Sequence, residues 1–258
     1  MLDGYEEFKK DIFSLTKIDL NAYKEKQMKR RIDTLITKNK VNTYKDYVAL
    51  IKKDNEKFEQ FVNFLTINVS EFYRNPEQWE YLDKHIMPEL IQKFGKNLKI
   101  WSAACSTGDE PYSLVMALSK HIPIKQIHIT ATDIDKQVLD KARLGLYNVK
   151  SIASVPDEFK KKYFTQIGAS YQISDEIKHQ VEFKEHNLLK DAYPTGCHMI
   201  VCRNVLIYFT EEAKEEIYKK FNSALVKDGV LFIGSTEQIM NYRELNYKRS
   251  QSFFFHKL

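Results

Sequence analysis

The most constraining feature of this sequence is Lys99–Leu114, which reads KIWSAACSTGDEPYSL. Two apolar residues lead into a run of small side chains, then Gly108 and the acids Asp109 and Glu110, after which an apolar helical pattern begins. This order predicts a strand, a tight turn and a helix start. Small side chains let a ligand approach backbone N–H groups, and a helix N-terminus adds partial positive charge. Because Glu110 would repel a pyrophosphate, the turn suits a nucleoside with hydroxyls and a positively charged tail.

The length and composition are those of an ordinary globular protein. With 258 residues, the chain can form one large domain or two of moderate size around a real core. No apolar run approaches the roughly 20 residues that span a bilayer. The first ten residues, MLDGYEEFKK, are acidic and amphipathic, unlike a signal peptide. We therefore expect a cytoplasmic protein without a transmembrane segment.

Cysteine and histidine usage gives no sign of a metal site. The three cysteines, Cys105, Cys197 and Cys202, are odd in number and lack paired spacing, which argues against a disulfide framework or a zinc site. The seven histidines are scattered without ligand spacing. The net charge of +5 permits an acidic partner but does not require one.

Residues 1–66 predict an all-α N-terminal domain. Apolar residues recur there at helical spacing, and Gly and Pro are almost absent. Thr43 and Asp46 have the spacing of a capping box at the start of one of four helices.

Residues 67–258 predict a second domain of the α/β class. A helix over Glu77–Phe94 is followed by alternating strands and helices, which indicates a mostly parallel sheet covered on both faces. The candidate strands are Leu98–Ala103, His128–Asp133, Val181–Glu185, His198–Cys202 and Gly229–Ile233, with a terminal antiparallel strand in SQSFFFHKL. Residues 163–181 depart from this rhythm and predict a small hairpin-like β insert.

Polar residues follow four successive candidate strands. Ligands of open parallel sheets bind beyond the carboxyl ends of the strands. Glu110 follows the first strand, and Asp133 ends the second, 25 residues after Gly108, near the spacing of an acid that contacts ribose. Asn187 follows the third strand and can offer its amide to a base edge. The segment Arg203–Tyr208 follows the fourth, so we expect these groups to converge on one crevice.

Five segments in this chain resemble the CheR family, the S-adenosylmethionine-dependent protein-glutamate O-methyltransferases of bacterial chemotaxis. They are NVSEFYR at Asn68–Arg74, SAACSTGDEPYSL, ATDIDKQVLDKARLGLY, HNLL and CRNVLIYF. The resemblance covers nearly the whole chain. It implies a Rossmann-like class I methyltransferase domain behind a helical domain. It also implies S-adenosylmethionine as cofactor and S-adenosylhomocysteine as product.

The same resemblance implies roles for individual residues. Asn68, Ser70 and Arg74 would reach the cofactor pocket from the linker between the domains. Glu110 would bind the cofactor's amino group and Asp133 its ribose. Asn187-Leu188 and Asn204-Val205 would frame the adenine and the methionine moiety. The turn at Ser102–Gly108 departs from the glycine-rich form common among methyltransferases, but it is usual within this family.

The mechanism follows from the implied substrate. A glutamate side chain is ionised at neutral pH and is already a nucleophile, so no general base is needed. Catalysis then depends on positioning and partial desolvation of the carboxylate. Arg74 and Tyr208 are the candidates for orienting it, because an arginine can donate two N–H bonds and a phenol one more. In the alternative interpretations, Arg74 binds the cofactor's own carboxylate and Tyr208 is a packed aromatic residue.

The second predicted helix carries a basic face. Its bases include Lys24, Arg30, Arg31 and Lys38, and of these Lys24, Arg31 and Lys38 recur at seven-residue spacing beside the apolar stripe. Such a run is usually a solvated face, but the resemblance implies docking on an acidic, glutamate-rich methylation helix of a chemoreceptor. The insert at 163–181 would bind a receptor's C-terminal peptide by strand addition or serve only as a structural flap. We expect a monomer that does not bind nucleic acid.

Two other functions remain open at the level of sequence. A methyltransferase of the same fold could act on RNA or a small molecule, although the N-terminal domain mixes acids among its bases and has no exposed-looking pattern of aromatic residues interleaved with them. An inactive cofactor-binding adaptor is the other alternative, against which the intact candidate site residues argue.

Overall fold

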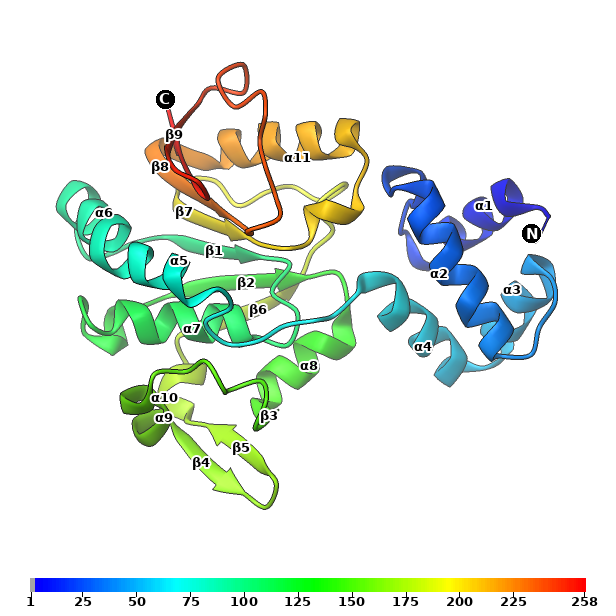
Figure 1. Ribbon diagram of the computed structural model, residues 1–258, viewed down its shortest axis with the longest axis horizontal. Helices are drawn as coiled ribbons and strands as arrows, with labels where there is room; N and C mark the ends of the chain where they lie inside the picture. Colours follow the sequence, from blue (N-terminus) through cyan, green and yellow to red (C-terminus); the bar gives the residue numbers. More distant parts are fainter. Residues whose placement is uncertain (1–2) are drawn as a thin grey trace. The chain divides into compact units, whose positions relative to one another are not determined.

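The computed structural model describes residues 3–258 and divides into two compact units (Figure 1). The first unit contains the described residues up to Asn68 together with Leu206–Glu216. The second contains Val69–Val205 and Ile217–Leu258. A segment from the second half of the sequence therefore belongs with the N-terminal helices, which a linear division of the chain does not reveal.

The first unit is a small helical bundle. Its elements are α1 (Tyr5–Thr16), the 3-10 helix η1 (Leu20–Ala22), α2 (Glu25–Lys38), α3 (Tyr44–Lys53) and α4 (Asn55–Thr66). Each α-helix turns one apolar face inward, and the buried rings of Phe8, Tyr47 and Phe61 meet in the core. The predicted capping pair is confirmed, because Thr43 Oγ1 accepts the Asp46 N–H at 3.0 Å and donates to the Asp46 carboxylate at 2.7 Å.

The segment Leu206–Glu216 is joined to the bundle by backbone hydrogen bonds. It contains the 3-10 helix η4 (Leu206–Tyr208) and the first turns of α11 (Glu211–Ala224). The Lys24 N–H donates to the Tyr208 carbonyl at 2.9 Å, and the Thr210 N–H donates to the Ala22 carbonyl at 2.8 Å. The rings of Tyr23 and Phe209 stack with centroids 4.6 Å apart.

The second unit is built on a seven-stranded sheet. Its strands are β1 (Ile100–Ala103), β2 (Ile129–Asp133), β6 (Val181–Glu185), β7 (Cys197–Cys202), β8 (Leu225–Ile233), β9 (Tyr247–Gln251) and β10 (Phe254–Lys257). Their order is β6-β2-β1-β7-β8-β10-β9, and all pairs are parallel except those of β10. The predicted mostly parallel sheet is confirmed, and the expected terminal strand proves to be a hairpin of two strands.

Helices cover both faces of this sheet. The helical elements of the second unit are α5 (Pro76–Tyr81), the π-helical turn η2 (Leu82–Ile86), α6 (Met87–Phe94), α7 (Asp109–Leu118), the 3-10 helix η3 (Ile124–Gln126), α8 (Lys136–Leu144), α9 (Asp157–Tyr163), α10 (Asp175–Lys178) and most of α11. In Figure 1, α7 and α8 lie on one side of the sheet and α11 on the other. Large buried side chains such as Trp79, Tyr112 and Phe232 fill the main core.

The predicted helix over 77–94 is interrupted at η2. Pro88 lies two residues beyond this wide turn and has no N–H to complete the α-helical ladder, so the backbone widens before it rather than continuing regularly. Gly95 ends the helix as predicted, with φ 76° at the C-cap.

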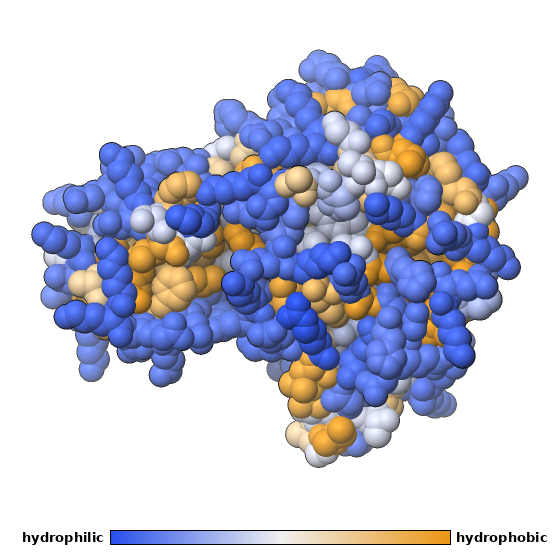
Figure 2. Space-filling model, turned by 180° about the vertical axis from the view of Figure 1, so that it is seen from behind, coloured by the Kyte–Doolittle hydropathy of each residue, from blue (hydrophilic) through white to orange (hydrophobic). Residues whose placement is uncertain are grey.

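The insert forms a separate three-stranded antiparallel sheet in the order β3-β5-β4. Its strands are β3 (Leu146–Asn148), β4 (Phe164–Ile167) and β5 (Ser170–Ile173). The predicted range 163–181 contains β4 and β5 but misses β3, which is too short to give a periodic signal. It also takes in Val181, which begins β6. Figure 2 shows apolar side chains at the tip of this small sheet, where Ile167 is 55% exposed.

Candidate active site

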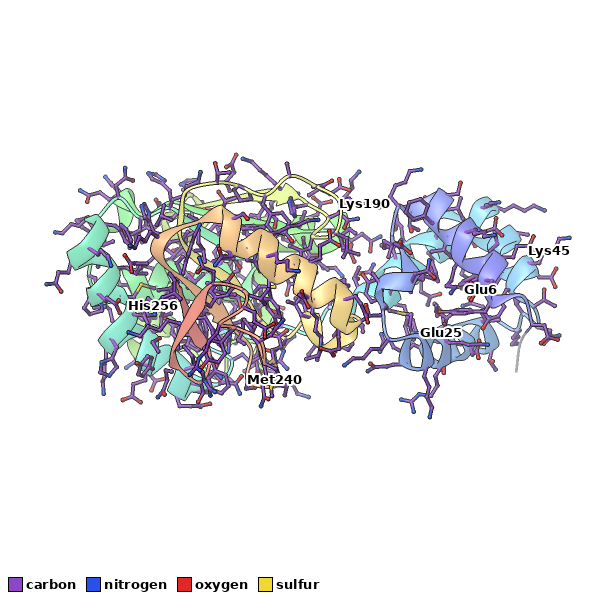
Figure 3. All side chains as sticks on the ribbon, turned by 90° about the horizontal axis from the view of Figure 1, so that it is seen from above. Glu6, Glu25, Lys45, Lys190, Met240 and His256 are labelled. Atoms are coloured by element: carbon purple, nitrogen blue, oxygen red, sulfur yellow. The ribbon has the colours of Figure 1, made fainter. Side chains whose placement is uncertain are left out.

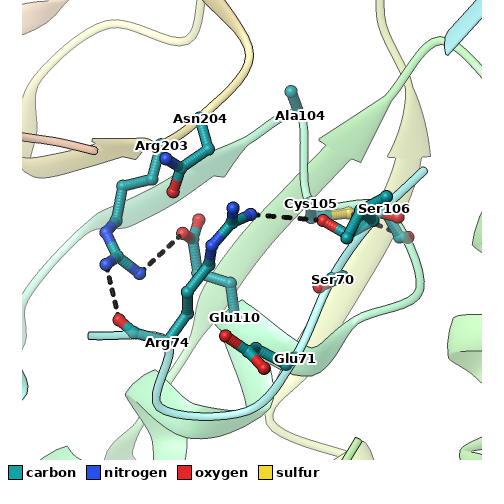
Figure 4. A pocket seen from close by; sticks show the side chains of 10 residues that line it. Ser70, Glu71, Arg74, Ala104, Cys105, Ser106, Glu110, Arg203 and Asn204 are labelled. Carbon is teal, nitrogen blue, oxygen red and sulfur yellow. Dashed lines mark hydrogen bonds and ion pairs between the residues drawn. The ribbon is translucent and has the colours of Figure 1, made fainter. Parts of the chain in front are cut away.

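A pocket of the second unit lies beyond the carboxyl ends of β1 and β7. Its empty space, counted out to where it opens to solvent, is about 350 Å³. Its lining residues are Val69, Ser70, Glu71, Arg74, Ala104, Cys105, Ser106, Glu110, Arg203 and Asn204 (Figure 4). Of the four strand ends predicted to converge on one crevice, the first and the fourth line this pocket together with the linker, whereas Asp133 and Asn187 at the second and third do not.

The turn after β1 is tight because its backbone reverses through left-handed conformations. Ala104 and Ser106 have φ of 61° and 49°, and Gly108, at the N-cap of α7, has φ 87°. A Cβ on Gly108 would lie 2.9 Å from the Cβ of Ala142, so only glycine fits this close approach to α8. The small side chains leave the backbone of the turn open to the pocket.

Asp133 holds this turn in place. Its carboxylate accepts the Ser106 N–H at 2.8 Å and the Asp135 N–H at 3.0 Å. Burial raises the pKa of Asp133 to about 6, and these backbone donors oppose that rise. Asp133 is not among the pocket-lining residues. In the structure, Asp133 anchors the turn through its hydrogen bond with the Ser106 N–H.

Glu110 is the acid of the pocket. Its side chain is only 13% exposed, its Oε1 accepts the Ser102 hydroxyl at 2.8 Å, and its Oε2 lies 3.7 Å from Nη1 of Arg203. Burial raises the pKa of Glu110 to about 7, although Arg203 opposes this rise. A buried carboxyl with this pKa can bind a positively charged ligand, because the ligand's charge would favour the ionised carboxylate.

Arg203 lies between Glu110 and the linker and interacts with both. Its Nη2 donates to the Arg74 carbonyl at 2.6 Å and to Gln78 Oε1 at 2.7 Å, and its guanidinium lies 4.6 Å from the centroid of the Phe232 ring. Sequence reasoning assigned no role to Arg203. It could have been found, since it immediately precedes Asn204 at the end of the fourth strand.

The linker contributes two of the predicted residues. Arg74 extends across the pocket (Figure 4), and its Nη1 makes only a long bond, 3.4 Å, to the Val69 carbonyl. Its guanidinium thus keeps donors for a ligand. Ser70 also lines the pocket and hydrogen bonds to the buried carboxyl of Asp109. Burial raises the pKa of Asp109, and the hydrogen bonds from Thr107 and Ser70 oppose that rise.

Several predicted site residues do not line the pocket. These are Asn68, Asp133, Asn187, Leu188, Val205 and Tyr208. Asn68 and Tyr208 belong to the first unit, where Asn68 Nδ2 donates to Thr66 Oγ1 at 2.8 Å. Asn187 Oδ1 accepts the Leu189 N–H at 2.9 Å, which leaves its NH₂ group as the part that could meet a base.

Asn204 and Val205 are held by a residue that the sequence analysis did not single out. The carboxylate of Glu237 accepts the Asn204 N–H at 2.9 Å and the Val205 N–H at 3.1 Å. Glu237 lies four residues beyond the end of β8, so inspection of a fifth strand end would have found it.

Comparison with known proteins identifies the family. The family model described as "CheR methyltransferase, SAM binding domain" matches residues 68–254, and "CheR methyltransferase, all-alpha domain" matches residues 3–66. The chain belongs to the CheR methyltransferase family. Similar curated proteins are the chemotaxis protein methyltransferases of Listeria innocua and Listeria monocytogenes, each 40% identical over 93% of this chain and 92% of the relative. That of Borreliella burgdorferi is 31% identical over 89% of this chain and 86% of the relative.

The family fixes the cofactor and the kind of enzyme. This CheR-family chain is a chemotaxis protein methyltransferase that uses S-adenosylmethionine, as predicted. The pocket fits that cofactor, since it joins the enclosed carboxyl of Glu110, an open turn of small residues, and a buried Asn204 Oδ1 that has no hydrogen-bond partner in residues 3–258. When bound, the cofactor supplies an electrophilic methyl group on a sulfonium.

No helix in residues 3–258 has the length and apolar character required to cross a membrane. Within the same range, no group of three His, Cys, Asp or Glu side chains has an arrangement that could hold a metal ion.

Proposed function

We propose that this enzyme transfers the methyl group to the side-chain carboxylate of glutamate residues on the methylation helices of chemoreceptors. The products are a glutamyl methyl ester and S-adenosylhomocysteine. The observation that carries the proposal is the pairing, in one pocket, of a buried acid that suits an ammonium group with a guanidinium, Arg74, that retains donors for a carboxylate.

In this proposal each side chain binds or orients, and none transfers a proton. Glu110 binds the cofactor's amino group, and the small-residue turn anchored by Asp133 receives its nucleoside. Arg74 grips a carboxylate, and the Tyr208 phenol donates a further hydrogen bond. The acceptor glutamate is ionised at neutral pH, so its oxygen can attack without a general base.

Arg74 has two possible carboxylate partners, that of the acceptor glutamate and that of the cofactor. We assign it to the acceptor, because Arg203 already pairs with Glu110 and leaves the Arg74 guanidinium across the open part of the pocket. Its loss is then expected to remove methyl transfer and spare cofactor binding.

We further propose that α2 docks the receptor. Lys24, Arg30 and Lys38 are exposed and supply positive charge for an acidic helix. Arg31, the fourth predicted docking residue, is half-buried, donates to the Phe64 carbonyl at 2.7 Å and lies over the Phe64 ring. Burial lowers the pKa of Arg31. Its main role in this proposal is to fasten α2 to α4.

The small sheet offers a second place for the receptor. β3 and β4 are its edge strands, and Leu146 and Ile167 on them are 42% and 55% exposed. A receptor's C-terminal peptide could extend this sheet by strand addition. A receptor truncated at its tail would then be methylated more slowly, whereas equal rates would leave the sheet a structural flap. We also propose that the enzyme acts in the cytoplasm as a monomer.

The decisive experiment incubates the full chain with radiolabelled S-adenosylmethionine and receptor-containing membranes. We expect label on the receptor that is released as methanol in alkali, because carboxyl methyl esters hydrolyse there. Alkali-stable label would point instead to a methyltransferase acting on another group. Cofactor binding without any transferred label would indicate an adaptor.

A further inference from the structure

Glu237 is a buried carboxylate at the junction of two strand ends. It is 4% exposed, whereas Met240 on the same loop is 83% exposed (Figure 3). Its Oε2 accepts the Asn204 N–H at 2.9 Å and the Gly234 N–H at 2.7 Å, and its Oε1 accepts the Val205 N–H at 3.1 Å. One side chain therefore ties the backbone after β7 to the backbone after β8.

The residue that Glu237 holds has an unusual backbone and faces the pocket. Asn204 has φ 60°, a left-handed conformation that L-residues other than Asn and Asp adopt reluctantly. Figure 4 shows its amide on the same side of the pocket as Glu110. Its buried Oδ1 has no partner in residues 3–258, while its Nδ2 makes only a 3.5 Å contact with Thr236 Oγ1. A buried acceptor without a partner is uncommon in a folded protein, so this oxygen has unused capacity for a hydrogen-bond donor.

The close packing of the two turns explains why a carboxylate is required. A Cβ on Gly234 would lie 2.6 Å from the Asn204 nitrogen and 2.8 Å from its Cγ. The N–H groups of Asn204, Val205 and Gly234 therefore point into one small space. Only a side chain with two acceptor oxygens can accept a hydrogen bond from all three. A glutamine would turn its NH₂ toward at least one N–H and leave that donor unpaired.

We propose that Glu237 is a positioning residue for the cofactor: by clamping Asn204, Val205 and Gly234, it fixes the Asn204 amide in the orientation that binds S-adenosylmethionine. This inference deepens the proposed function, because it rests on the cofactor occupying this pocket. It adds a residue from a fifth strand end, which does not line the pocket but accepts a hydrogen bond from the lining residue Asn204.

The test measures equilibrium binding of S-adenosylhomocysteine to the full chain by calorimetry. Glu237→Gln removes the charge and one acceptor, and we expect its Kd to rise at least tenfold. Glu237→Asp keeps the charge, but its side chain is shorter by one methylene, so its Kd for S-adenosylhomocysteine should rise roughly three- to tenfold. Glu244→Gln, in the same loop but exposed, is the matched control and should bind like the wild type.

Steady-state kinetics separate positioning from a general structural role. For Glu237→Gln, the KM for S-adenosylmethionine should rise about tenfold while kcat at saturating cofactor stays within threefold, and the circular dichroism spectrum should match that of the wild type. Binding within twofold of the wild type in a folded Glu237→Gln variant overturns the proposal. If that variant does not fold, unchanged binding by Glu237→Asp has the same consequence.

Glu110→Gln distinguishes failure of this inference from failure of the site assignment. Weak binding by Glu110→Gln with normal binding by the Glu237 variants would reject only the role of Glu237. Normal binding by Glu110→Gln would mean that the cofactor does not use this pocket as proposed, and both ideas would fall together.

Discussion

The guanidinium of Arg203 lies 3.7 Å from the carboxylate of Glu110, and the two side chains are 3% and 13% exposed. The pair only partly offsets the desolvation of the acid, because its two groups are too far apart for a hydrogen bond, and the Arg203 donors are directed to the Arg74 carbonyl and to Gln78. Burial therefore dominates and raises the pKa of Glu110 to about 7. Glu110 can therefore interact with a second cation in addition to Arg203.

Cofactor affinity should depend on pH through Glu110. An ammonium ligand binds the ionised carboxylate, so protonation of Glu110 below pH 7 should weaken binding. With a pKa of about 7, affinity should rise roughly eightfold between pH 6 and pH 7.5. Calorimetry with S-adenosylhomocysteine measures this directly. Besides Arg203, the Ser102 hydroxyl and Arg74 favour the ionised form of Glu110, and Glu237 opposes it.

Glu110→Gln provides the comparison. The variant should bind more weakly at every pH above 7 and should show little pH dependence between 6 and 7.5. Glu244→Gln should retain the slope of the wild type. A slope that persists in Glu110→Gln would assign the titration to another group.

Arg74→Ala should lower the rate of methyl transfer at least about 100-fold, because the acceptor carboxylate loses two charge-assisted hydrogen bonds and with them its orientation. We expect the Kd for S-adenosylhomocysteine to change less than threefold. The assay is transfer of label to receptors at saturating cofactor. A parallel loss of cofactor binding would show that Arg74 holds the cofactor's carboxylate instead, and near-normal turnover would refute both roles.

Tyr208→Phe should lower kcat about tenfold and leave the Kd for S-adenosylhomocysteine unchanged, since it removes one hydrogen-bond donor to the acceptor carboxylate. The backbone of η4 should not move, because it is the Tyr208 carbonyl that accepts the Lys24 N–H. Comparison of thermal denaturation curves checks this point. If kcat is unaffected, Tyr208 is a packed aromatic residue rather than a site residue.

Charge reversal on α2 should weaken receptor docking. Arg30→Glu combined with Lys38→Glu should raise the receptor KM several-fold, more strongly at low salt, without changing cofactor binding. Lys45→Glu on α3 makes the same kind of change elsewhere on the helical unit and is the control (Figure 3). An unchanged receptor KM in the double variant would end the docking proposal.

Arg31→Glu should lower stability, unlike the Arg30→Glu and Lys38→Glu substitutions on the same helix. It breaks the hydrogen bond to the Phe64 carbonyl and places an acid against that backbone oxygen, so the variant should denature at a lower temperature. Thermal denaturation compares it with Arg30→Glu, which should be as stable as the wild type.

The sequence determined the main features of this protein because they depend on local patterns. Apolar spacing in residues 3–66 specified amphipathic helices, and alternating strands and helices specified a parallel sheet. The small-residue turn and Glu110 lie directly beyond a strand, so their place in a pocket followed from the geometry of parallel sheets. Motif order was enough to indicate the family.

Tertiary structure decided what depends on contacts distant in sequence. Arg203 meets the linker carbonyl of Arg74, 129 residues away, and Glu237 meets the N–H of Asn204, 33 residues away. No local pattern encodes such a pairing, since a buried polar group takes whichever partner the fold brings within reach. The short strand β3 and the grouping of Leu206–Glu216 with the helical bundle have the same origin, because each is stabilised by hydrogen bonds to distant backbone.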